Sequence, residues 1–97
     1  MTVASILREA ATLPWTQGAL ARTGKNRRCH PRDTKAVAFC ADGAIYRAAI
    51  AYPPAIRIQA KRALYQVIGR DLVDWNDEVG RTPDEVKAKM LEAAERV

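Results

Sequence analysis

The residues best suited to chemistry lie in two separate segments of this 97-residue chain. One is the run Cys40-Ala41-Asp42-Gly43, which places a thiol and a carboxylate inside the most apolar stretch. The other is Trp75-Asn76-Asp77, where an indole precedes an amide and a carboxylate. Polar groups that converge beside aromatic rings are typical of small-molecule sites. One hypothesis is therefore a polar pocket, with Gln17, Asp42, Trp75, Asn76 and Asp77 as its members.

The same residues also have a structural interpretation, which is the main expectation. Small residues around Gly43 would form a flat strip on a helix, and a helical glycine costs about 1 kcal/mol relative to alanine. We therefore expect a close partner on that strip, either another helix or the ring of Trp15 or Trp75. Asp42 would then accept a hydrogen bond from an indole N–H or from a loop backbone. In this interpretation the Trp75 loop serves to anchor the chain to the core.

Other catalytic and metal-binding arrangements find little support in the sequence. Ser5, the only serine, falls inside a predicted helix without the glycines of a nucleophile elbow. Cys40 is predicted to be buried, where thiols are inert, and its spacing to Cys29 and His30 matches no standard zinc pattern. We therefore predict no catalytic residue, no metal and no cofactor. A ligand-binding or enzymatic role for Asp42 and the Trp75 loop is kept as an alternative.

The charge of the chain is unevenly distributed. The net charge is +5, but residues 22–70 carry eleven basic and two acidic residues, whereas residues 71–97 carry eight acidic and four basic ones. The basic residues form two candidate surfaces, a basic arm and one face of a later helix. The arm holds Arg22, Lys25, Arg27, Arg28 and Arg32, and the helix face holds Arg57, Lys61, Arg62 and Tyr65. Cations beside an aromatic ring suit phosphates and bases, an acidic protein surface, or solvent alone.

The elements that must position these residues are mostly helical. Apolar periodicity and end signals predict helices over 2–13, over 33–51, over 54–68 and from Thr82 to the end. Residues 14–33 are irregular, with a plausible hairpin in which 19–22 and 27–30 flank a turn. Residues 70–81 are predicted to be a loop or a short turn of helix. The predicted fold is mainly α: about four helices around one core, with a small β-hairpin or irregular arm between the first two, in a single domain over 1–97.

The compartment is predicted from what the chain lacks. No run of about 18 apolar residues could span a membrane. The first residues carry Arg8 and Glu9 where a signal peptide would be apolar. We expect a cytoplasmic protein with no membrane partner, and two free thiols rather than a disulfide.

Several short motifs occur together, in an order that covers most of the chain. They are Trp15 to Arg22, Pro31-Arg32-Asp33, Phe39 to Ala44, Trp75-Asn76-Asp77 and Gly80 to Val86. In this order they resemble a family of small, functionally uncharacterised proteins of bacteria and their phages. The resemblance implies a phage or mobile-element context and carries no assigned chemistry.

Together these observations predict a small, basic, non-enzymatic binding protein. Its partner would be an acidic protein surface or a protein–nucleic acid complex of a host, and inhibition of a host defence system is one concrete version. Direct nucleic-acid binding is the alternative. The sequence predicts no oligomeric state.

Overall fold

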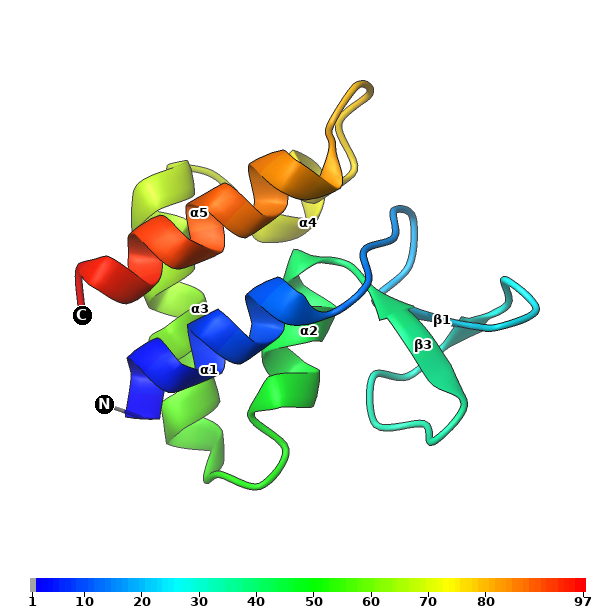
Figure 1. Cartoon of the computed structure of the whole chain (residues 1–97), viewed down its shortest axis with the longest axis horizontal. Coiled ribbons are helices and arrows are strands. Elements are labelled where there is room, and N and C mark those ends of the chain that lie inside the picture. Colours follow the sequence, from blue (N-terminus) through cyan, green and yellow to red (C-terminus); the bar gives the residue numbers. More distant parts are fainter. Residues whose placement is uncertain (1) are drawn as a thin grey trace.

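Five helices and a three-stranded sheet make up residues 2–97, the part of the chain that the computed structural model describes (Figure 1). The helices are α1 (Thr2–Thr12), α2 (Ala41–Ala48), α3 (Pro54–Ile68), α4 (Leu72–Asn76) and α5 (Pro83–Glu95). The strands are β1 (Ala21–Thr23), β2 (Arg28–Cys29) and β3 (Ala36–Phe39). The mainly α prediction is confirmed, whereas the predicted number of helices is one too low. None of the helices in residues 2–97 is long and apolar enough to cross a membrane.

The core lies between the helices. α1 packs against α2, α3 and α5, and Figure 1 shows α1 and α5 running side by side with α3 crossing behind them. Leu7, Ile45 and Leu64 are completely buried at this junction. Most of the other buried apolar side chains are alanines. Such small side chains let the backbones of neighbouring helices approach closely in a densely packed core.

The sheet forms an arm that projects from the helical layer (Figure 1). The strand order is β2-β1-β3, and both pairings are antiparallel. Asn26 has a left-handed φ of 63° in the turn between β1 and β2, a conformation that asparagine tolerates better than most residues. The hairpin predicted within residues 19–30 is therefore confirmed, and β3 is an additional strand.

The prediction of one helix over residues 33–51 is wrong in its first part. Residues 36–39 form β3, and α2 begins only at Ala41, with Cys40 as the N-cap. β3 pairs with β1 on one side, and on the other Phe39 N–H donates to Pro14 O at 2.8 Å. A four-residue apolar run suits a strand as well as a helix, so long-range pairing decides between them.

Gly43 lies in the first turn of α2, and its close partner is a backbone group. A Cβ atom at this position would lie 1.9 Å from Leu20 O. That same carbonyl accepts a hydrogen bond from Cys40 N at 3.1 Å. The expected close approach is present, but the predicted partner was wrong, since it is neither a helix nor a tryptophan ring.

The two helix ends with the strongest sequence signals are confirmed. α3 ends at Gly69, which has a left-handed φ of 80°. α5 begins with the predicted capping box, in which the Thr82 and Glu85 side chains bond each other's backbone N–H. The loop after Asp77 is thereby fixed at its end, and this loop borders the candidate site.

We expect Gly43→Ala to lower the free energy of unfolding by about 3 kcal/mol, because the new methyl group displaces the Leu20 backbone. Helix propensity alone predicts the opposite sign, a gain of about 1 kcal/mol. Chemical denaturation measures the difference. Gly24→Ala is the matched control, since a Cβ there meets nothing within 4 Å, and it should change stability little. A Gly43→Ala protein as stable as wild type would disprove the role given to the Leu20 contact.

Candidate functional site

The amide of Asn76 is the centre of a buried hydrogen-bond network. The residue ends α4, and it is completely buried. Its Oδ1 accepts from Trp15 Nε1 at 2.7 Å and from Ala41 N at 2.9 Å. Its Nδ2 donates to Thr16 O at 3.1 Å and to Asp77 Oδ1 at 3.0 Å. The four bonds use the full hydrogen-bonding capacity of a side-chain amide.

Gln17 and Asp77 extend this network across the same junction. Gln17 Nε2 donates to Asn76 O at 2.9 Å and to Glu78 O at 3.0 Å. Asp77 Oδ1 also accepts from Gly18 N at 3.0 Å. The structure therefore brings Gln17, Asn76 and Asp77 together, as the pocket hypothesis required. Their bonds, however, tie residues 15–18 to residues 76–78, and a ligand would have to break them.

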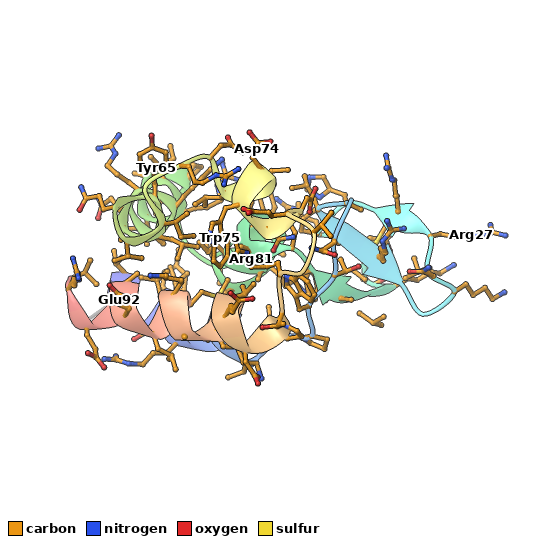
Figure 2. The ribbon with its side chains drawn as sticks, turned by 90° about the horizontal axis from the view of Figure 1, so that it is seen from above. Arg27, Tyr65, Asp74, Trp75, Arg81 and Glu92 are labelled. Carbon is orange, nitrogen blue, oxygen red and sulfur yellow. The ribbon has the colours of Figure 1, made fainter. Side chains whose placement is uncertain are left out.

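Trp75 borders the network and is covered by Arg81. The Arg81 guanidinium carbon lies 4.0 Å from the centroid of the Trp75 ring, and Figure 2 shows the two side chains against each other. Arg81 Nε also donates to Trp75 O at 3.0 Å, and the guanidinium forms ion pairs with Glu78 and Glu85. Arg81 lies in the motif Gly80 to Val86 but was not predicted to be a site residue. Its contact with Trp75 joins residues six positions apart, a spacing that no helical or strand period predicts.

Asp42 does not belong to this network. Its carboxylate forms an ion pair with Lys61 at 3.1 Å, and its side chain is 22% exposed. The prediction that Asp42 accepts from an indole or from a loop backbone is wrong, since the Trp15 N–H is bound by Asn76. Among the described residues, no buried side-chain nitrogen or oxygen lacks a partner. The network offers a ligand no unpaired buried polar atom, which favours the structural interpretation.

The two cysteines are both free thiols and lie in different surroundings. Cys40 caps α2, where its Sγ accepts from Gly43 N at 3.3 Å. Burial, as the largest cause, raises the pKa of the Cys40 thiol from 9.0 to about 11. Cys29 is half-buried in the arm. His30 does not pair with Cys40; its Nδ1 accepts from Arg32 N at 3.0 Å. Within residues 2–97, no three His, Cys, Asp or Glu side chains are grouped to hold a metal.

The basic arm presents most of its cations to solvent. Lys25, Arg27, Arg28 and Lys35 line an open groove of about 550 Å³. Figure 2 shows Arg27 extending from the end of the molecule that lies away from the helices. Among the described residues, none of these four side chains forms an ion pair with an acidic residue. Lys35 was not among the predicted binding residues, although its position within the basic segment was a usable signal.

Arg22 differs from the other arm cations because its guanidinium serves the fold. Its Nε and Nη2 donate to Gln17 O at 3.3 and 3.1 Å, and its Nη1 donates to Asn26 O at 3.1 Å. These bonds brace the hairpin against the segment that carries the Asn76 network. Arg22 is thus half-buried and structural, unlike Arg27 and Arg28.

The predicted basic face of α3 is not one uniform surface. Arg57 lies over the ring of Tyr46, with its guanidinium carbon 4.5 Å from the centroid, and Lys61 is paired with Asp42. Arg62 and Tyr65 are exposed beyond them, and Figure 2 places Tyr65 at the opposite end of the molecule from Arg27. Of these residues only Arg57 lines a hollow that also includes a residue of the arm, Arg32.

The comparison with protein families assigns the chain. A family model matches residues 1–96. The chain belongs to DUF6197, a family of unknown function. No curated protein and no solved structure matches it. Membership of DUF6197 confirms the expected relation to an uncharacterised family. The family description names no activity and no partner. The phage context and the motif signature remain predictions.

We expect Asn76→Ala to lower the free energy of unfolding by about 3 kcal/mol or more, because it leaves the Trp15 N–H, the Ala41 N–H and the Thr16 carbonyl without this partner. Such a loss is a large part of the total of about 5–15 kcal/mol typical of a domain. Chemical denaturation gives the value. Asp74→Ala is the control on the same helix, and should cost little because that side chain is exposed. Equal stability of the two variants would argue that Asn76 does not anchor the fold.

We expect Cys29 to react with iodoacetamide in the native protein, and Cys40 to react only after unfolding. The thiolate is the reactive form, and the Cys40 pKa of about 11 keeps that thiol protonated near neutral pH. Mass spectrometry of the labelled peptides distinguishes the two. Equal labelling rates would show that Cys40 is not shielded.

The same thiol has a consequence for stability at alkaline pH. The unfolded thiol ionises near 9.0 and the folded one near 11, so the unfolded state binds fewer protons between these values. The contribution of Cys40 to the free energy of unfolding therefore falls as pH rises through this window. Cys40→Ala removes the contribution and should give a shallower decline.

Proposed function

We propose that the protein is a non-enzymatic binding protein that holds an acidic macromolecule on the basic arm, residues 21–35. The observation that carries the proposal is the set of unpaired cations around the groove of about 550 Å³. Asp33 is the only acidic residue of the arm, and its Oδ1 accepts from Lys35 N at 2.8 Å. The arm therefore carries a surplus of positive charge that nothing on the arm neutralises.

The ion pairs of the chain support this interpretation. In residues 2–97 every ion pair joins residues between Asp42 and Arg96, and none includes a residue of the arm. The ion pairs that the acidic C-terminal segment does form are local ones, such as Arg96–Glu92 at 3.0 Å. Exposed charges further apart than a Debye length of about 10 Å are largely screened. A partner of opposite charge is the simplest use of the surplus.

The partner is an acidic protein surface or a protein–nucleic acid complex. The phage or mobile-element context implied by the resemblance favours a host component, and inhibition of a host defence system is one version. Direct nucleic-acid binding is the second candidate. A specific observation favours it, since Arg32 and Arg57 meet two tyrosines in one hollow.

We expect Arg27→Glu combined with Arg28→Glu to weaken binding to acidic probes by about 10-fold or more, and to make binding less salt-dependent, because each lost phosphate contact reduces counterion release. Titrations would use a fluorescent single-stranded oligonucleotide, a duplex and polyglutamate at about 50 mM and about 200 mM salt. The melting temperature should stay near wild type, since both side chains are exposed.

The control is Arg8→Glu combined with Lys87→Glu, which makes the same charge change on α1 and α5. Both residues are exposed, and neither forms an ion pair within the described chain. This variant should bind within about twofold of wild type. Equal weakening by both variants would mean that only net charge matters. Binding by the arm variant as tight as wild type at both salt concentrations would overturn the proposal.

A further inference from the structure

A small hollow lies where the arm meets the start of α3. Its volume is about 160 Å³. Two tyrosines and two arginines supply its chemistry: Tyr46, Tyr52, Arg32 and Arg57. Arg32 and Arg57 belong to the two predicted basic surfaces, whereas Tyr52 belongs to no predicted site and to no part of the Asn76 network. The hollow therefore includes one residue from each of the two predicted basic surfaces, Arg32 from the arm and Arg57 from the face of α3.

Arg57 is held in place without using its hydrogen-bond donors. Its guanidinium carbon lies 4.5 Å from the centroid of the Tyr46 ring, and His30 packs against that ring in a T-shaped arrangement with centroids 4.9 Å apart. Within residues 2–97, the Arg57 guanidinium forms no hydrogen bond or ion pair. An oriented guanidinium with free N–H groups is suited to bind a phosphate bidentately.

Arg32 is the second cation of the hollow, and its backbone is fixed. Arg47 Nη1 donates to Pro31 O at 2.7 Å and to Asp33 O at 2.9 Å, on either side of Arg32. The Arg32 N–H donates to His30 Nδ1 at 3.0 Å. The Arg32 side chain is exposed and has no acidic partner in the described chain. Two unpaired guanidinium groups therefore line one hollow, and their surroundings are rigid.

Tyr52 provides an aromatic surface that the fold does not use. Its side chain is 43% exposed, beside Ile50, which is 41% exposed. In residues 2–97 the Tyr52 ring makes no ring stacking contact and its hydroxyl no hydrogen bond. A nucleobase stacks favourably on such a ring, whichever base it is. Acidic peptide side chains would satisfy the arginines but leave this ring without a partner.

The size of the hollow favours one unit of a polymer over a free small molecule. Pockets that hold a small ligand usually measure about 300–1,000 Å³, whereas this one measures about 160 Å³. The hollow also adjoins the groove of the arm, because Arg32 lines the hollow and the next residue, Asp33, lines the groove. Asp33 is negatively charged, so a strand that continued from the hollow would follow the cations that also line the groove, Lys25, Arg27, Arg28 and Lys35.

The geometry points to a site for one nucleotide of a single-stranded nucleic acid, with its base on Tyr52 and its phosphate bound by Arg32 and Arg57. A single strand is required because a base inside a duplex is already stacked and paired, and removing it from the stack costs free energy. The inference rests on the proposed function in its second version, in which the arm binds nucleic acid directly, and it names the kind of nucleic acid. It adds a stacking contact that the charge of the arm alone does not supply.

The test is binding of fluorescent oligouridine and oligothymidine of about ten nucleotides. Tyr52→Leu should weaken binding about 10-fold, whereas Tyr52→Phe, which keeps the ring, should bind like wild type. An oligonucleotide of the same length without bases keeps the phosphates. It should bind wild type and Tyr52→Leu equally. Because Tyr52 is exposed, the melting temperatures of both variants should match that of wild type.

The outcomes separate this inference from the proposed function. If Tyr52→Leu binds oligouridine as tightly as wild type while the Arg27 and Arg28 reversals weaken it, the stacking site is wrong and the basic arm stands. Preference of wild type for duplex over single strand, or binding to polyglutamate alone, would also overturn the inference. If wild type binds none of the probes, the inference and the proposed function both fall.

Discussion

A single buried amide determines how the helical layer and the sheet are joined. Asn76 accepts from Trp15 and from the first residue of α2, and donates to Thr16 and Asp77. A buried donor or acceptor that loses its partner costs about 1–3 kcal/mol, so each bond resists displacement of the segment it holds. The Asn76 amide therefore fixes the relative positions of three segments: the start of α2, the segment before β1 and the end of α4.

The arm is attached rigidly at its base and free at its tip. The carbonyl of Leu20 packs on Gly43, Arg22 binds Gln17 O, and Arg47 binds the backbone of residues 31 and 33. These contacts all lie where the strands meet the helices. The side chains of Lys25, Arg27 and Arg28 lie beyond them and form no ion pair with any described residue. A partner that binds them would meet a scaffold that is already ordered, and would lose less entropy than one that must fold a loop.

The elements that the sequence predicted well are those whose signals are local. The cap at Thr82 and the stop at Gly69 each depend on a few neighbouring residues, and both are present. β3 was mistaken for a helix because its identity depends on pairing with β1, some 15 residues away, and a short apolar run does not encode that pairing. Of the five residues grouped in the predicted pocket, Gln17, Asn76 and Asp77 form the network. Trp75 only borders it, and Asp42 lies outside it, paired with Lys61. The role of the network as an anchor was already the main expectation, but the individual partners depend on contacts 59 to 61 residues apart. Charge counts identified the arm but could not separate Arg22, which braces the hairpin, from its exposed neighbours.

The separation in sequence between the amide and the groups it binds has a consequence for protein synthesis. The Trp15 N–H and the Ala41 N–H share one acceptor, Asn76 Oδ1, which lies 61 residues after Trp15 and 35 residues after Ala41. Neither N–H has this acceptor until Asn76 has been synthesised. A ribosome adds about 5–20 residues per second, so roughly 2–7 s pass between Ala41 and Asn76. During that interval the nascent arm has its full positive charge but not the contact that will anchor it. Ribosomal RNA is a polyanion, so we expect it to attract the arm before the Asn76 contacts form.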